Sequence, residues 1–111
     1  MQKNEGEYKE ILDFCELVQY QSGIIVSKTI IDDENGRVSL FAFAKGEKVS
    51  PHQSPYDALV QVLEGEAEIL IGDQSFVVKA GKAIVLPANI MHSITAHQNF
   101  KMLLTLIKSS V

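Results

Sequence analysis

The stretch PHQSPYDALVQVLEGEAEILIG, residues 51–72, contains two alternating apolar runs separated by a glutamate–glycine turn. The apolar residues that alternate on one face of these runs are Ala58, Val60 and Val62, then Ala67, Ile69 and Ile71. A period of two residues is the pattern of β-strands that bury one face. Leu59 and Leu63 are apolar on the opposite face of the first run. We therefore expect that second face to be covered as well, by another layer or by a second subunit.

Short apolar runs of the same kind, separated by turn residues, occupy the chain on both sides of this stretch. They span residues 23–31, 38–44, 75–80, 83–88, 92–96 and 100–108. Between the first two, Asn35-Gly36 is a pair that tolerates the positive φ of a tight hairpin turn. No helical crossover lies between the runs, which favours an antiparallel sandwich or barrel over βαβ units. The sequence predicts an all-β fold.

The apolar residues of the N-terminal segment have helical spacing rather than the alternation of a strand. Ile11, Phe14, Cys15 and Val18 follow helical spacing within residues 8–20, and residues 1–7 have the composition of a frayed terminus. The chain has 111 residues, which suffices for one hydrophobic core. We expect residues 1–20 to form an arm or short helix and residues 21–111 to form the single β domain.

Composition excludes several partners. The net charge is −4, and the basic residues, one arginine and nine scattered lysines, form no cluster. Nucleic acids and anionic membranes require clustered Lys and Arg, so we expect neither as a partner. No apolar run is long enough for a membrane span, and the polar N-terminus lacks the apolar core of a secretory leader. The single cysteine, Cys15, excludes an intramolecular disulfide and suits a reducing cytoplasm.

Glycine, proline and histidine spacings carry a resemblance to a known family. The positions involved are Gly46, His52 and Gly65 in a first motif, then Gly81, Pro87 and His92 in a second. Together they resemble the two motifs of small single-domain cupins. The resemblance implies a double-stranded β-helix, that is, a jelly-roll barrel, and a homodimer. In metal-bearing cupins it also implies a divalent ion such as Zn, Ni, Fe or Mn, held by three histidines and a glutamate.

The metal-ligand positions of that family are only half retained. His52 and His92 occupy the first and last ligand positions, whereas Ser54 and Ala58 stand at the second histidine and the glutamate. A catalytic metal normally takes at least three protein ligands, and alanine supplies none.

Two further positions, Asp57 and Asn89, lie at or next to motif positions of the family. Asp57 precedes the glutamate position by one residue, so it would face the pocket only if a β-bulge near Pro55 turned it inward. Asn89 occupies the internal glycine of the second motif. The third histidine, His97, is best interpreted as a surface or turn residue.

Three functions remain open at this point. The leading hypothesis is a protein that binds a low-molecular-weight ligand in the barrel. The residues expected to line that pocket are His52, Ser54, Ala58, Val60, Asn89 and His92. The alternative is a metal-dependent enzyme of dioxygenase or isomerase type that uses His52 and His92 as metal ligands. A third is an interaction module that works through a dimer surface and the N-terminal arm. The sequence assigns no catalytic residue.

Overall fold

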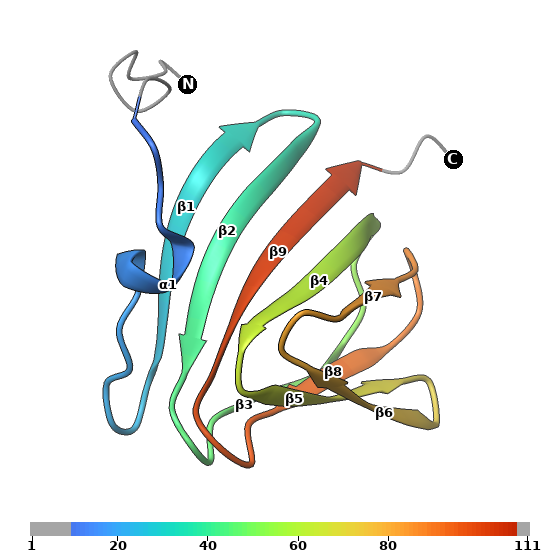
Figure 1. Ribbon diagram of the computed structural model, residues 1–111. Helices are drawn as coiled ribbons and strands as arrows, with labels where there is room; N and C mark the ends of the chain where they lie inside the picture. Colours follow the sequence, from blue (N-terminus) through green and yellow to red (C-terminus); the bar gives the residue numbers. More distant parts are fainter. Residues whose placement is uncertain (1–9, 109–111) are drawn as a thin grey trace.

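The computed structural model describes residues 10–108, which form one short helix and nine strands (Figure 1). The elements are α1 (Phe14–Leu17), β1 (Ile25–Asp33), β2 (Gly36–Phe43), β3 (Lys48–His52), β4 (Tyr56–Glu64), β5 (Glu66–Ile71), β6 (Gln74–Lys79), β7 (Ala83–Leu86), β8 (His92–Thr95) and β9 (Phe100–Lys108). The predicted all-β fold is confirmed. No helix among these residues has the length and apolar content needed to cross a membrane.

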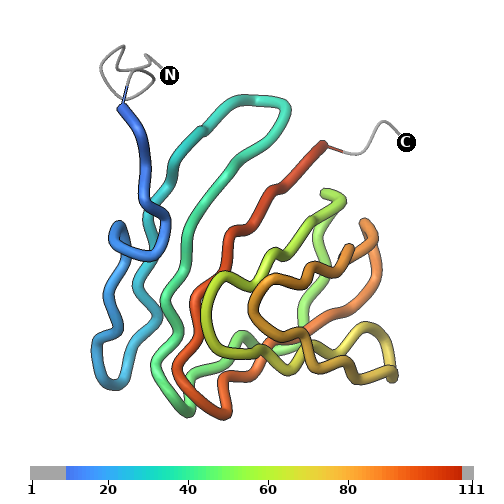
Figure 2. The backbone as a smooth tube through the Cα atoms, viewed as in Figure 1, coloured from blue at the N-terminus to red at the C-terminus, as the bar shows by residue number. Residues whose placement is uncertain are grey.

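The strands form two antiparallel sheets that face each other. The five-stranded sheet has the order β1-β2-β9-β4-β7, and the four-stranded sheet has the order β3-β8-β5-β6. The chain passes repeatedly between the two sheets, as the backbone path in Figure 2 shows. The β1–β2 hairpin and the end of β9 extend beyond the four-stranded sheet (Figure 1). One end of the larger sheet is therefore left uncovered on its inner face.

The core lies between the two sheets and uses the alternation seen in the sequence. Five of the inward residues of β4 and β5 are buried, and a sixth, Ile71, is half-buried; the buried five are Ala58, Val60, Val62, Ala67 and Ile69. Phe43 and Phe100 stack at the centre with their ring centroids 4.5 Å apart. Burial of this apolar surface is the main driving force for closing the barrel.

The outer face of the larger sheet is covered by the chain's own N-terminal segment. Val18 packs there against Leu40 and Leu103, and Leu63 of β4 joins the same cluster. Residues 14–20 of this chain thus supply a covering layer over Leu63. The charged Lys101 lies beneath this layer, where its Nζ donates a hydrogen bond of 2.6 Å to the carbonyl oxygen of Cys15.

The predicted helix is much shorter than its spacing suggested. Only Phe14–Leu17 is helical, and Ile11, expected on the packed face, is fully exposed. At Val18 the backbone is already extended, with φ −130. An isolated helix of this length is marginal in water, and packing on the sheet decides its extent. Residues 1–9 of the expected arm and residues 109–111 of the expected β domain lie outside the described part of the chain.

Two local features also differ from expectation. The sequence did not predict β3, which contains Pro51. This strand lies at the edge of its sheet and its register shifts between Val49 and His52, and both circumstances tolerate proline. In the β1–β2 hairpin the turn residues are Glu34 and Asn35, and Asn35 has no positive φ. Gly36 instead begins β2, where an added Cβ would lie 2.4 Å from the carbonyl oxygen of Leu106.

Candidate ligand-binding site in the barrel

A cavity of about 430 Å³ lies between the two sheets. It is lined by Ile25, Phe41, Phe43, Val49, His52, Ser54, Tyr56, Ala58, Leu86, His92, Ile94, Met102, Leu104 and Leu106. Most of these side chains are apolar, and the polar ones come from β3, β8, the turn before β4 and the first residue of β4. An apolar cavity with a few polar groups on one part of its wall is the usual form of a small-molecule site.

His52 and His92 lie side by side in this wall. They are direct partners in the β3–β8 ladder, and their rings meet edge to face with centroids 4.4 Å apart. The register shift between Val49 and His52 sets this pairing. A bulge of this kind changes the face to which the following side chain points. The two histidines that are forty positions apart in the sequence therefore meet, as expected.

Backbone carbonyl groups fix the tautomer of both rings. Nδ1 of His52 lies 3.1 Å from the carbonyl oxygen of Ser50, and Nδ1 of His92 lies 3.2 Å from that of Ile90. A carbonyl oxygen only accepts, so each Nδ1 carries the hydrogen and donates it. In the neutral ring, Nε2 is then a hydrogen-bond acceptor. Nε2 of each ring has no hydrogen-bond partner among the described residues.

The environment keeps His92 neutral at physiological pH. The residue is only 8% exposed, and this burial lowers the pKa of its imidazole below the ordinary value. The neighbouring His52 lowers the pKa further, because two adjacent positive charges repel, while the bond to Ile90 opposes the change. The neutral ring offers an acceptor rather than a positive charge to the cavity.

The other residues expected at the site divide into two groups. Ser54 and Ala58 line the cavity beside the histidines, whereas Val60 is completely buried in the core and Asn89 is exposed; neither belongs to the lining. Asn89 has a structural part: its backbone N–H donates to the carbonyl oxygen of Ser54 at 2.8 Å. This bond joins the loops that precede β8 and β4. Asn89 adopts φ +65, a conformation that glycine and asparagine accept most readily.

These observations can be set beside known proteins. A family model described as the cupin domain matches residues 39–107, more than half of the chain. The chain belongs to the cupin family. A comparison with functionally curated proteins finds no match.

Solved structures from several bacteria are similar to this cupin. A conserved protein of unknown function from Streptococcus pyogenes is 33% identical, with a TM-score of 0.86 over 92% of this chain and 90% of that one. A cupin 2 conserved barrel domain protein from Leptotrichia buccalis is 46% identical, with a TM-score of 0.82 over 85% of this chain. The match spans only 46% of that longer chain. A cupin superfamily protein from Desulfitobacterium hafniense is 29% identical, with a TM-score of 0.86 over 91% and 93% of the two chains.

The metal site that the family implies is incomplete in this cupin. Among residues 10–108, no group of three or more His, Cys, Asp or Glu side chains is placed to hold a metal ion. Asp57 does not supply a third ligand: it is exposed, and its Oδ1 accepts a hydrogen bond of 2.9 Å from the N–H of Ala88. Its pairing with Ile107 is regular, so no bulge near Pro55 turns it inward. Two imidazoles fall short of the donor set that a catalytic metal requires.

Some lining residues were not foreseen. Ile25, Val49, Leu86, Ile94 and Leu106 complete the apolar wall. The alternation of side chains along a strand could have identified two of them. Ile94 follows His92 by two positions, and Leu106 continues the inward row of Met102 and Leu104 on β9.

The third histidine lies elsewhere. His97 is exposed, and its Nε2 lies 2.9 Å from Oε1 of Glu68. It is absent from the cavity lining, in accordance with its interpretation as a surface residue.

Proposed function

We propose that this cupin binds a small, mainly apolar molecule in the barrel cavity and holds a hydrogen-bond donor of that molecule against His52 and His92. The observation that carries the proposal is a pair of adjacent histidines in the wall of a mainly apolar cavity of about 430 Å³. A phenol, alcohol or amide N–H would supply the donor, and the apolar body would fill the space along Phe41, Met102 and Leu104.

Physical reasons support a preference for donors. Each Nδ1 is engaged by a backbone carbonyl, so Nε2 is the ring atom that remains for a partner. An apolar ligand would displace water from these acceptors and leave them without a partner, which costs free energy, whereas a ligand hydroxyl replaces the displaced water. An apolar ligand without a donor gains the burial of its surface but leaves the nitrogens unsatisfied. The resulting discrimination is about 1 kcal/mol, or about fivefold in affinity.

A matched pair of probes tests this proposal. Calorimetric titration with 4-propylphenol and 4-propylanisole compares two ligands that differ in whether the oxygen carries a hydrogen. We expect the phenol to bind about fivefold more tightly, and His92→Ala to remove the difference. His97→Ala is the control, because it deletes an exposed histidine outside the cavity. Equal affinities for the two probes in the native protein would contradict the proposed anchor.

A cavity-filling variant separates the barrel from other surfaces. Ala58 is buried in the wall of the cavity, so Ala58→Leu places additional side-chain volume where the ligand would lie. We expect this variant to remain folded and to bind neither probe. Retained affinity in Ala58→Leu would place the binding site outside the barrel.

The metal-dependent enzyme is the alternative function, and the observation that favours it is the adjacency of two histidines in the cavity wall with Nδ1, and not Nε2, bound to backbone carbonyl groups. It requires donors beyond those that residues 10–108 bring together. Metal content of tag-free protein, measured by mass spectrometry with His52→Ala as the comparison, decides between the two. Near-stoichiometric metal that disappears in the variant would favour the enzyme. The cytoplasmic location and the homodimer expected from the sequence stay predictions.

A further inference from the structure

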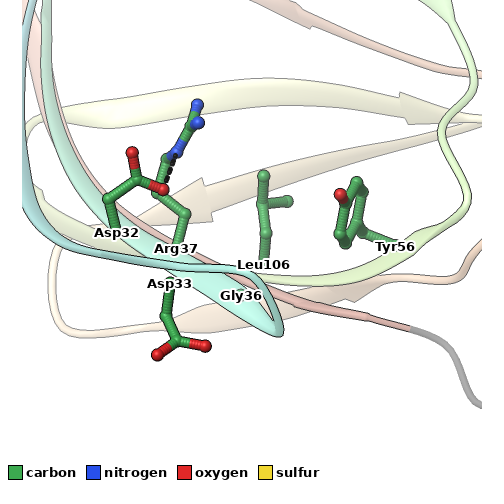
Figure 3. A pocket seen from close by; sticks show the side chains of 6 residues that line it. All are labelled: Asp32, Asp33, Gly36, Arg37, Tyr56 and Leu106. Carbon is green, nitrogen blue, oxygen red and sulfur yellow. Dashed lines mark hydrogen bonds and ion pairs between the residues drawn. The ribbon is translucent and has the colours of Figure 1, made fainter. Parts of the chain in front are cut away.

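A smaller pocket adjoins the barrel cavity at the tip of the β1–β2 hairpin. Its volume is about 100 Å³, and its lining is Asp32, Asp33, Gly36, Arg37, Tyr56 and Leu106 (Figure 3). Tyr56 and Leu106 also line the barrel cavity, so the two spaces share part of their walls. The small pocket lies on the part of the larger sheet that extends beyond the four-stranded sheet (Figure 1).

Strand register places Arg37 on the same face of the larger sheet as the residues that line the barrel cavity. Arg37 is the cross-strand partner of Leu106, and Leu106 is the partner of Ala58. Side chains that are directly opposite in a sheet point to the same face. Arg37 therefore lies on the inner face, at the end of a row that begins inside the cavity.

A β-bulge brings an acidic residue to the same face. The register of β1 and β2 shifts between Thr29 and Ile31, after which Asp32 pairs with Arg37. Without the extra residue, Asp32 would point to the opposite face. Oδ1 of Asp32 lies 3.3 Å from Nε of Arg37, so the carboxylate holds the guanidinium from its Nε side.

The remaining part of the guanidinium faces away from Asp32. Figure 3 shows the two terminal nitrogens of Arg37 on the far side from that contact, with Leu106 between Arg37 and Tyr56. Figure 3 also shows the carboxylate of Asp33 on the opposite side of the ribbon from Arg37. Arg37 and Asp32 are 53% and 37% exposed, and an ion pair in water contributes little stability. A ligand can therefore engage the terminal nitrogens at little cost.

A second cation lies near this end of the sheet. Lys108 is the cross-strand partner of Tyr56, which places it on the same face as Leu106 in β9. Arg37 and Lys108 thus share the inner face of this uncovered end with the carboxylate of Asp32, while Asp33, which also lines the pocket, has its carboxylate on the other side of the ribbon (Figure 3).

We infer that the hairpin-tip pocket recognises a carboxylate group at the end of the barrel ligand, with Arg37 as the residue that determines this specificity. The inference rests on the proposed function. The ligand class becomes an apolar molecule with a hydrogen-bond donor for the histidine pair and a carboxylate for Arg37. The planar guanidinium presents parallel N–H groups that match the two oxygens of a carboxylate.

Two probes that share a phenol test the inference. The acid is 3-(4-hydroxyphenyl)propanoate, and the neutral analogue is 3-(4-hydroxyphenyl)propan-1-ol. In calorimetric titrations we expect the native protein to bind the acid about three- to fivefold more tightly, the effect of a guanidinium–carboxylate pair at a half-exposed site. Arg37→Gln should abolish the preference and leave the affinity for the alcohol unchanged. Arg37→Lys, which keeps the charge without the planar fork, should retain part of it.

A control variant tests whether the preference for the acid depends on the position of the cation. Lys82→Gln removes an exposed cation in the turn before β7, at the opposite end of β4 from Tyr56, and should leave the preference intact. Circular dichroism confirms that each variant is folded. Equal binding of the two probes, or a preference that survives in Arg37→Gln, overturns this inference and leaves the proposed function standing. Binding of neither probe overturns both.

Discussion

His52 and His92 face each other across the β3–β8 ladder with ring centroids 4.4 Å apart, and each donates from Nδ1 to a carbonyl oxygen two residues earlier in the chain. The same local arrangement thus occurs on both strands. Its consequence is that two acceptor nitrogens are available at one part of an apolar cavity, whereas the carboxylate and third histidine of a complete metal site are replaced by Ala58 and Ser54.

Stability should depend on pH through His92. Its pKa in the folded protein is lowered by burial and by His52, so the unfolded chain binds a proton more readily. The contribution of His92 to the free energy of unfolding is complete above the ordinary histidine pKa of about 6.5 and is lost as the pH falls below it. Urea denaturation at several pH values between about 5 and 8 measures this loss.

The matched variants for that experiment are His92→Gln and His97→Gln. The first removes the buried titrating group and should flatten the decline in stability toward acidic pH. The second removes the exposed histidine beside Glu68 and should leave the decline nearly unchanged. An equal slope in native protein and His92→Gln would show that other groups control the acid sensitivity.

Restoring the missing ligands should create a metal site. Ser54 and Ala58 line the same cavity as His52 and His92, so the double variant Ser54→His, Ala58→Glu places four donors around one space. We expect this variant to bind about one Ni²⁺ or Zn²⁺ per chain and the native protein to bind far less. Dialysis against each metal followed by mass spectrometry provides the measurement.

The single variant Ala58→Glu is the control for the gain in metal binding, because it adds the carboxylate without the third histidine of the four-ligand set. Near-stoichiometric metal in the native protein under the same conditions would contradict the view that two histidines are insufficient.

Lys101 should stabilise the attachment of the N-terminal segment. Its side chain is only 6% exposed, donates to the carbonyl oxygen of Cys15 at 2.6 Å and lies 3.8 Å from a carboxylate oxygen of Glu64. The hydroxyl of Tyr20 donates to that same carboxylate. Lys101→Met keeps an apolar stem but leaves the carbonyl unsatisfied, so the free energy of unfolding should fall by about 1–3 kcal/mol.

An exposed lysine on a strand provides the comparison for Lys101. Lys79→Met, on β6, should change stability by no more than about 0.5 kcal/mol. If both substitutions had the same small effect in chemical denaturation, the buried contact would contribute nothing measurable.

We expect a homodimer to bury an apolar surface that residues 10–108 leave exposed. Leu59 and Val85 are cross-strand partners on the outer face of the larger sheet, and Val85 and Ile107 are both more than half exposed. The N-terminal segment covers Leu63 but leaves Val85 exposed. If the dimer packs through this face, Val85→Asp should convert it to a monomer in light scattering coupled to gel filtration. A monomeric native protein would contradict the predicted dimer.

The strands that alternate cleanly were predictable from the sequence, because burial of one face imposes a period of two. Val60, Val62, Ala67 and Ile69 are buried as that period requires. The short strand β3 was not predictable in this way, since Pro51 argues against a strand and is tolerated only at a sheet edge beside a register shift. A short N-terminal helix was predicted and is present, but its limits were not predictable from apolar spacing, because packing on the sheet decides where the helix ends.

The candidate site was predictable in part for the same reasons. Motif spacing indicated that His52 and His92 would meet, and the structure brings them together. Side-chain parity placed Asp57 outside, and its contact with the N–H of Ala88 agrees with that placement. The position of Asp32 beside Arg37 depends on a bulge in β1 for which the sequence gives no signal.

The central claim is that Nε2 of the histidine pair accepts a hydrogen bond from a molecule in the barrel. Nitrogen-15 NMR of the imidazole rings during a titration with 4-propylphenol at pH 7.5 tests it most directly, because the shifts report tautomer and hydrogen bonding for each ring. We predict hydrogen on Nδ1 of His52 and His92, a saturable change at their Nε2 resonances, and no change at His97. Saturation with the phenol that leaves the Nε2 resonances of His52 and His92 unmoved would contradict the claim.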